Sequence, residues 1–189
     1  MKKTIKFFIA MMIAVVSLNQ ATAQNYKSIE FDLGFRYDIL TGDYTGGGLG
    51  GFLEPRYNIN DKFAVGLRLG IDLLGGTLKD SELKVSSSVL SSYIVTGDYM
   101  LVNKGNKRVF AGLGLGFSGQ GSLELETDID TPTPNGGPEV GTVFGIVPRI
   151  GAKLGILKLA LDYSIYPKDG AKSFIGVNVG LSFGGRMKK

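Results

Sequence analysis

Apolar and polar side chains alternate along most of this chain. From Ile29 to Ile39 every odd position is apolar, and every even position is charged or glycine. A period of two is that of a β-strand whose two faces meet different surroundings. The alternation returns in eight segments. We predict strands near residues 29–40, 48–57, 62–73, 83–102, 108–118, 142–154, 157–166 and 173–184.

The two faces of the predicted strands differ in kind. One face is almost wholly apolar and carries no charge, whereas the other carries glycines together with seven acidic and seven basic side chains. The acidic residues are Glu30, Asp32, Asp38, Glu54, Asp72, Asp98 and Asp162, and the basic residues are Arg36, Arg56, Arg68, Lys84, Arg149, Lys153 and Lys158. Eight such strands can close into a small barrel, with one face directed outward and the other lining the lumen.

Two orientations of these faces compete. In a transmembrane barrel the charged face lines the lumen, whereas in a water-soluble barrel of the lipocalin type it covers the exterior. The interspersed glycines favour the transmembrane orientation, because a narrow lumen needs space beside long Arg and Glu side chains and a wet exterior does not. The matched charges agree with it, since buried ions are tolerated when they are paired.

We therefore predict an all-β fold, an eight-stranded antiparallel up-and-down transmembrane β-barrel with an ion-pair network in its lumen. The predicted network comprises Asp32, Arg36, Asp38, Glu54, Arg56, Arg68, Asp72, Asp98, Arg149, Lys153, Lys158 and Asp162.

The predicted connections alternate between short and long, as they do in outer-membrane barrels. With the N-terminus on the periplasmic side, the longer loops face outward from the cell. These loops are 41–47, 74–82, 119–141 and 167–172. The predicted strand 83–102 is longer than the ~9–11 residues that a tilted span needs, so we expect its outer part to stand above the membrane.

Aromatic side chains on the apolar face give an independent check, because aromatic rings gather at membrane–water boundaries. With strands running alternately up and down, these rings fall at two levels. The predicted periplasmic girdle consists of Phe31, Tyr57, Phe63, Tyr99 and Phe183, and the outer girdle of Tyr37, Phe117 and Phe144.

The first residues predict export. Basic residues at the start precede an apolar run over 7–18, and Ala21-Thr22-Ala23 has the small-x-small form of a cleavage site. We expect residues 1–23 to be a secretory signal peptide and residues 24–189 to form the barrel domain. The apolar run is too short to cross a bilayer as a helix. The chain has no cysteine, so neither a lipid anchor on cysteine nor a disulfide is predicted.

Removal of the signal peptide also changes the charge. Residues 1–23 contain Lys2, Lys3 and Lys6, so their loss lowers the formal net charge from +4 to +1. Without a basic excess, nucleic acid is not an expected partner.

The chain from Ile29 to Phe183 resembles the small outer-membrane β-barrels typified by the OmpA and OmpX transmembrane domains, especially the single-domain barrels of Bacteroidetes-type bacteria. The resemblance rests on the export signal, the eight alternating strands and the final strand over 175–183. It implies a bacterial outer-membrane location, lipid as the surrounding partner, and recognition of the last strand, with Phe183, by the barrel-insertion machinery. In this chain, unlike the family pattern, residues 184–189 follow the final aromatic residue.

Few residues suit catalysis, and we predict no catalytic residue and no cofactor. The chain has no histidine, so a Ser-His-Asp relay is excluded, and zinc and copper lack their usual ligands. Residues 114–119 match G-x-G-x-x-G, but phosphate binding requires that those glycines open a helix, and here they extend a strand. Asp32 and Asp38 allow acid–base chemistry in principle, although ion pairing with lumen bases is the favoured interpretation.

The third long loop carries four acidic residues with a period of two: Glu124, Glu126, Asp128 and Asp130. Their carboxylates suit a hard cation. The hypothesis is a site for Ca²⁺ or for a basic partner at the cell surface. The alternative is a solvated face that keeps the loop soluble.

The favoured function is that of a non-enzymatic integral outer-membrane protein, with a lumen blocked by ion pairs and surface loops for envelope structure or adhesion. The alternative is a narrow porin-like transporter, similar to OmpW-like barrels, that passes small or apolar solutes through the lumen or a lateral opening. A lipid-modifying enzyme is disfavoured, because outer-membrane barrel enzymes resemble one another in using histidine as the general base.

Overall fold

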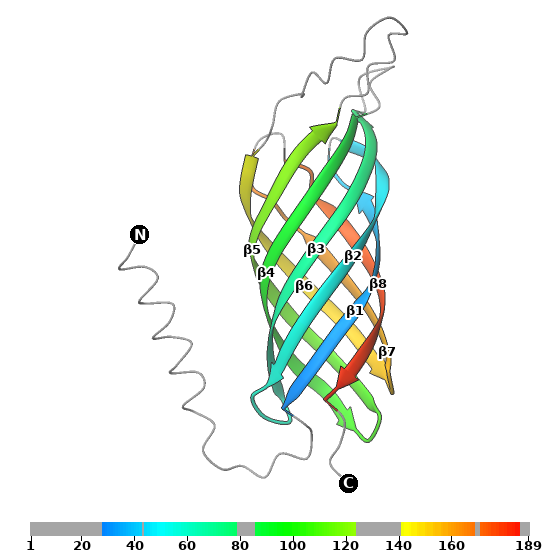
Figure 1. The fold of residues 1–189 in the computed structure, drawn as a ribbon, viewed down its shortest axis with the longest axis vertical. Coiled ribbons are helices and arrows are strands. Elements are labelled where there is room, and N and C mark those ends of the chain that lie inside the picture. Colours follow the sequence, from blue (N-terminus) through cyan, green and yellow to red (C-terminus); the bar gives the residue numbers. More distant parts are fainter. Residues whose placement is uncertain (1–27, 43, 79–85, 124–140, 169–170, 186–189) are drawn as a thin grey trace, which may run out of the picture.

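The computed structural model describes residues 28–42, 44–78, 86–123, 141–168 and 171–185. Eight antiparallel strands form a closed barrel in which neighbours in sequence are neighbours in the sheet, and the last strand pairs with the first (Figure 1). The strands are β1 (Ile29–Leu40), β2 (Tyr44–Asn58), β3 (Phe63–Leu78), β4 (Ser86–Lys104), β5 (Lys107–Leu123), β6 (Gly141–Leu154), β7 (Leu157–Ser164) and β8 (Phe174–Gly184). The predicted fold class, an up-and-down all-β barrel, is confirmed.

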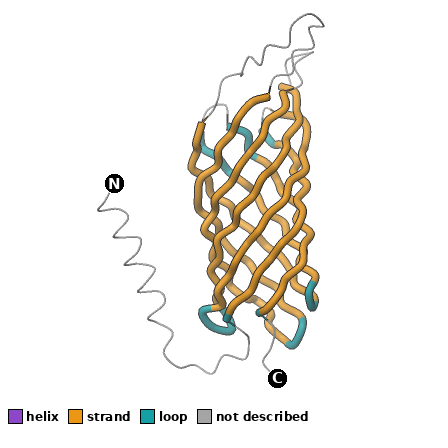
Figure 2. The backbone as a smooth tube through the Cα atoms, viewed as in Figure 1, coloured by secondary structure: helices purple, strands orange, loops and turns teal. Residues whose placement is uncertain are grey.

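The two ends of the barrel differ. Short turns join β2 to β3, β4 to β5 and β6 to β7 at the end where β1 begins and β8 finishes, which we call the lower end (Figure 2). The opposite ends of the strands form the upper end. Gly105 and Gly155 in two of the lower turns have φ of 57° and 65°, a region that glycine adopts without steric cost.

Strand pairing carries the alternation of the sequence around the whole barrel. In an antiparallel ladder, directly opposite residues point to the same face of the sheet, so one parity stays inside and the other outside. β1 pairs Leu33 with Leu53 of β2 and with Leu181 of β8, and all three side chains point outward. A bulge between Met100 and Val102 shifts the register of β4 against β5 near the lower end.

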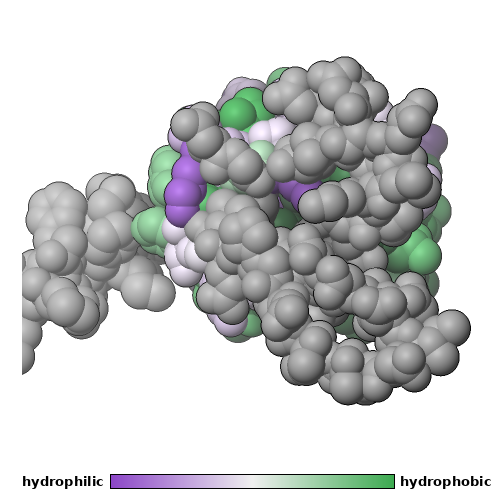
Figure 3. All heavy atoms as spheres, turned by 90° about the horizontal axis from the view of Figure 1, so that it is seen from above, coloured by the Kyte–Doolittle hydropathy of each residue, from purple (hydrophilic) through white to green (hydrophobic). Residues whose placement is uncertain are grey.

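The barrel has its apolar side chains outside and its charges inside. Leu67 and Ile71 are 43% and 64% exposed, whereas Glu54 and Lys158 are fully buried. In the view from above, the hydrophobic surface that is visible lies at the periphery of the barrel (Figure 3). An apolar belt of this extent around a charged interior requires hydrocarbon as the surrounding solvent. Within the described residues, no helix is long and apolar enough to span a membrane.

Several strands reach farther toward the upper end than predicted. β2 begins at Tyr44 instead of residue 48, and β3 continues to Leu78 instead of residue 73. Gly46 and Gly47 of β2 pair there with Gly76 and Gly75 of β3. Glycine shows no alternation of side chains, so this segment reads as a loop in sequence, yet its backbone groups pair as in any ladder.

The wall is consequently uneven in height. β3, β4 and β5 contain 16, 19 and 17 residues, whereas β7 contains 8 and ends at Ser164. A tilted span needs about 9–11 residues. The β3–β5 side of the barrel therefore extends beyond the bilayer at the upper end, as we expected for β4.

Candidate functional site

The lumen holds the polar chemistry of the described chain, and Glu54 lies at its centre. Arg149 donates to both carboxylate oxygens, with Nη2 2.6 Å from Oε1 and Nη1 3.1 Å from Oε2. Lys158 Nζ lies 3.0 Å from Oε2, and Thr96 donates its hydroxyl to Oε1 at 2.9 Å. Arg68 Nε lies 3.4 Å from Oε2, and Arg56 Nη1 lies 3.3 Å from Oε1. Residues from five strands thus converge on one carboxylate.

A second group of charges fills the lower lumen around Asp32. Lys158 Nζ lies 2.5 Å from Asp32 Oδ2, and Lys153 Nζ lies 3.2 and 3.1 Å from the two oxygens. Lys153 also pairs with Glu30. Arg108 closes the lower mouth, because its Nη1 lies 2.6 Å from Glu30 Oε2.

A third group occupies the upper lumen around Arg36. Its Nε lies 2.8 Å from Asp38 Oδ1, its Nη1 lies 3.7 Å from Asp72 Oδ2, and its Nη2 pairs with Asp162. Arg68 Nη1 reaches the other oxygen of Asp162 at 2.8 Å. Three carboxylates therefore share two guanidinium groups.

The glycines of the inner face leave the space that these side chains occupy. A methyl group built on Gly176 would lie 2.5 Å from Arg36 Nε and 2.7 Å from Asp162 Oδ1. A methyl group on Gly50 would collide with the carboxylate of Asp72. At these two positions the structure supports the reason given for the glycines, because each omits a side chain beside a long lumen neighbour.

Apolar rings also enter the lumen, which we did not predict, although Phe52 shares the parity of Glu54 and Arg56. Phe52 lies under the guanidinium of Arg68, 4.7 Å from its Cζ, and Phe110 lies 5.7 Å from both Arg56 Cζ and Arg149 Cζ. These are cation–π distances. The rings separate charged groups and fill volume that paired ions leave open.

An upper apolar layer covers the charged part of the lumen. It consists of inward-facing side chains that are at most 6% exposed: Leu40, Leu74, Leu90, Val143, Tyr166 and Phe174. The rings of Tyr166 and Phe174 are 6.0 Å apart. Our description of the inner face as polar was incomplete, because apolar residues occupy it at both ends. Leu40, Leu74 and Leu90 share the parity of the charges, so the sequence did contain this signal.

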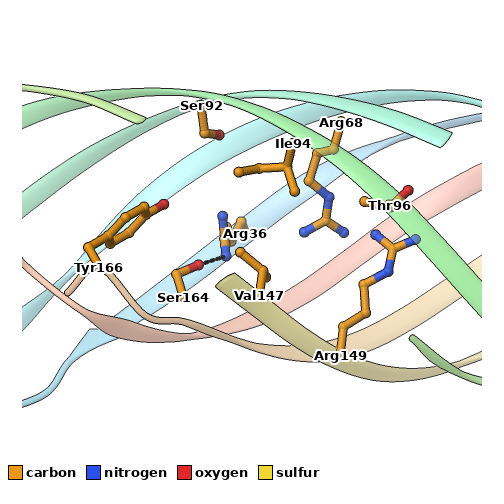
Figure 4. A pocket seen from close by; sticks show the side chains of 9 residues that line it. All are labelled: Arg36, Arg68, Ser92, Ile94, Thr96, Val147, Arg149, Ser164 and Tyr166. Carbon is orange, nitrogen blue, oxygen red and sulfur yellow. Dashed lines mark hydrogen bonds between the residues drawn. The ribbon is translucent and has the colours of Figure 1, made fainter. Parts of the chain in front are cut away.

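Two small cavities lie in the part of the barrel that the structure describes. A cavity of about 10 Å³ lies under the upper apolar layer, and its lining includes Arg36, Arg68 and Arg149 together with Ser92 and Tyr166 (Figure 4). A second cavity of about 10 Å³ lies at the lower mouth beside Arg108. A single water molecule needs roughly that volume. Neither cavity accommodates a nutrient-sized solute.

The structure places the predicted network residues together. All twelve are at most 4% exposed and each takes part in an ion pair with another inward-facing residue. Arg108 was missed, because it opens a strand next to a turn and its parity was not assigned. Lys84, which we included among the lumen bases, lies outside the described residues.

The predicted girdle residues lie outward at the two levels. Phe63 and Tyr99 pack with ring centroids 4.9 Å apart near the lower end, and Phe117 and Phe144 pack at 5.6 Å nearer the upper end. Phe31 and Phe183 pair directly between β1 and β8. The remaining two girdle residues, Tyr37 and Tyr57, lie on β1 and β2.

Other predicted features fall elsewhere. Residues 114–119, the G-x-G-x-x-G match, lie inside β5, and no helix follows them in the part of the chain that the structure describes. The Ca²⁺ candidates Glu124, Glu126, Asp128 and Asp130 and the predicted signal peptide 1–23 lie outside the described residues. Among the residues that are described, no three acidic groups are arranged to hold a metal ion.

Solved structures of bacterial proteins have a similar fold. Ail, the attachment invasion locus protein of Yersinia pestis, is 12% identical over 84% of this chain and 99% of its own, with a TM-score of 0.51. The outer membrane protein OprG from Pseudomonas aeruginosa is 11% identical over 86% of this chain and 100% of its own, also with a TM-score of 0.51. No protein-family model and no curated protein sequence matches the chain. The apolar exterior and this shared fold identify the chain as a transmembrane β-barrel of the outer-membrane type.

Proposed function

We propose that this protein is a non-conducting, non-enzymatic scaffold in the outer membrane, which presents its upper end at the cell surface for envelope structure or adhesion. The observation that carries the proposal is the filled lumen. An ion-pair network occupies its middle, the upper apolar layer covers it, and the Arg108–Glu30 pair lies at its lower mouth. A hydrated ion would have to break several buried ion pairs to pass, and each such break is costly.

The uneven wall supports a role at the surface. β3, β4 and β5 reach above the bilayer and join to the connections that include residues 79–85 and 124–140. The similar barrel Ail is named for attachment, and another structure of it holds the heparin analogue sucrose octasulfate. In this chain the segment 124–130 carries four acidic residues and no basic one. We therefore propose a cation or a basic partner, and not a sulfated polyanion, as the ligand of that loop.

The absence of histidine and cysteine from the sequence supports a role without catalysis. The inward carboxylates that could act as acid or base are held by cations: Asp32 by two lysines and Glu54 by Arg149 and Lys158. Both carboxylates therefore already serve as ion-pair partners in the lumen. Incubation of the purified protein with labelled lipid A should give no modified product.

Planar-bilayer recording tests the scaffold proposal directly. We expect purified protein to insert without producing a steady current, while a general porin added afterwards to the same bilayer conducts. Heat-dependent migration on a gel should show that the inserted protein is folded. A steady, reproducible open-channel current from the folded protein would overturn the proposal.

A lateral opening between β6 and β7 is the second candidate function, and one observation favours it. The β6–β7 ladder runs to Arg149 and Asp162, and pairing resumes only at Ile146 and Ile165. Pro148 occupies this gap and has no N–H to donate. Val147, Arg149, Ser164 and Tyr166 around the gap also line the upper cavity. An apolar solute that passed between the strands at this gap would enter the bilayer directly.

A cross-link distinguishes the two functions. Pro148→Cys combined with Tyr163→Cys would tie β6 to β7 across the gap, and the chain has no other cysteine to interfere. If the barrel transports apolar solutes laterally, uptake into proteoliposomes should fall on oxidation and recover on reduction. A scaffold gives no uptake in either state.

A further inference from the structure

Exposed charges are unevenly distributed over the outer surface of the barrel. Apart from Lys168 near the upper end, the exposed lysines among the described residues lie on two turns at the lower end. Lys62 ends the β2–β3 turn, and Lys104 and Lys107 flank the β4–β5 turn. Asp61 is the single acidic residue in the sequence of these two turns. One sector of the lower rim is therefore basic.

The two turns are joined to each other. Met100 donates its backbone N–H to the carbonyl of Lys62 at 2.7 Å, and the side-chain amide of Asn103 donates to the carbonyl of Asp61. Asn60 Oδ1 accepts the backbone N–H groups of Lys62 and Phe63, each at 2.8 Å. The lysines therefore project from a fixed backbone and not from independent loops.

Lys104 and Lys107 stand directly opposite each other in the ladder. Like charges in such a cross-strand pair destabilise a hairpin. The ion pairs among the described residues lie in the lumen, and none involves Lys62, Lys104 or Lys107. Departures from favourable local charge placement are expected at functional sites. An anion between the two ammonium groups would make the pair favourable.

The level of the lysines indicates which anion they meet. Phe63, directly after Lys62, packs against Tyr99, and both rings are outward-facing, 50% and 39% exposed. Aromatic rings of this kind mark the boundary between hydrocarbon and headgroups. The three lysines lie immediately beyond that boundary, and lysine stems extend readily along it to place the charge at the polar surface.

We propose that Lys62, Lys104 and Lys107 bind the phosphate of an anionic phospholipid in the periplasmic leaflet, with the Phe63–Tyr99 pair against its acyl chains. The site anchors one side of the barrel at a fixed depth. The inference rests on the transmembrane orientation of the barrel and is independent of what the upper loops bind.

Spin-labelled lipids test the proposal in vesicles of phosphatidylcholine that contain the full-length protein. At low salt each lysine near an anionic headgroup is worth roughly a fivefold preference. We expect the protein to associate more strongly with spin-labelled phosphatidylglycerol than with spin-labelled phosphatidylcholine, and the preference to weaken as NaCl is raised. In the triple variant K62Q/K104Q/K107Q, the preference for phosphatidylglycerol over phosphatidylcholine should be at least about tenfold weaker than in the wild-type protein. The control Lys168→Gln should keep it.

A single charge reversal should change the stability of the protein and its lipid preference in opposite directions. Lys107→Glu converts the like-charge pair into an attractive one, so its thermal midpoint in zwitterionic detergent should rise while its phosphatidylglycerol preference falls. Equal association of the wild-type protein with both lipids would overturn the proposal. So would a K62Q/K104Q/K107Q variant that folds and keeps the wild-type preference.

Discussion

Arg149 and Asp98 form a two-point ion pair across the lumen, with Nε 2.8 Å from Oδ1 and Nη2 2.7 Å from Oδ2. The same guanidinium also contacts Glu54. A planar guanidinium suits such bidentate contacts, and both partners are buried. The pair therefore ties β6 to β4, and through Glu54 to β2, by contacts that strand pairing alone does not supply.

Removal of Arg149 should destabilise the barrel strongly. Arg149→Met removes one cation from Asp98, which keeps Arg56, and from Glu54, which keeps Lys158, and breaking a buried pair in this way typically costs about 3–5 kcal/mol. Urea-induced unfolding in lipid vesicles, followed by circular dichroism, measures the change. The double variant R149M/D98N removes one charge of each sign and leaves Arg56 paired with Glu54, so it should recover part of the loss. A cost below about 1 kcal/mol for Arg149→Met would show that the pair contributes little.

The outward and inward positions should respond differently to substitution. Leu67→Arg places a charge in the middle of the lipid-facing wall and should destabilise by about 2–4 kcal/mol. Ser182 faces the lumen and its hydroxyl lies 3.3 Å from Lys153 Nζ, which also contacts Asp32. Ser182→Ala should therefore cost no more than about 1 kcal/mol. Equal costs at the two positions in the same unfolding assay would contradict the assigned facing.

The sequence was sufficient to predict the closed barrel and its facing, because both follow from a period of two that every strand repeats. Arg36 and Asp162 share a parity, so their meeting in the lumen was accessible in principle. The pairing of a particular cation with a particular carboxylate could not be predicted from the sequence. Arg36 and Asp162 are 126 residues apart, and several other partners satisfy the same alternation. The heights of β2 and β3 were missed for a different reason: glycine runs carry no side-chain pattern.

The upper lumen contains three carboxylates and two arginines, so neutralising different carboxylates should change the stability of the barrel in opposite directions. Asp38, Asp72 and Asp162 share Arg36, whereas Arg68 reaches Asp162 alone among the three. Asp72 is the farthest from Arg36, at 3.7 Å. Asp72→Asn removes a weakly compensated buried charge and should be neutral or stabilising.

The matched control is Asp162→Asn, which leaves Arg36 and Arg68 short of an acceptor and should destabilise. Thermal midpoints of the folded barrel in detergent measure both variants. A lower midpoint for Asp72→Asn than for Asp162→Asn would mean that Asp72 is fully compensated, and that the charges of the upper lumen are balanced differently.

The two glycines Gly97 and Gly112 test the role of space in the lumen. They lie on the paired strands β4 and β5. Gly97 points outward, and a methyl group added to it would meet no atom within 4 Å, whereas a methyl group on Gly112 would collide with Asp98 and lie 2.5 Å from the backbone oxygen of Gly97.

Gly112→Ala should therefore cost about 1–3 kcal/mol by overpacking, because backbone atoms cannot move aside. Gly97→Ala should be neutral or stabilise by up to about 1 kcal/mol, since alanine reduces the freedom of the unfolded chain. The same vesicle unfolding assay compares the two, and the double variant should show nearly additive costs if the inner face alone is crowded. Equal tolerance at both positions would mean that the lumen yields to an added methyl group, and that glycine is not needed there to make room for Asp98.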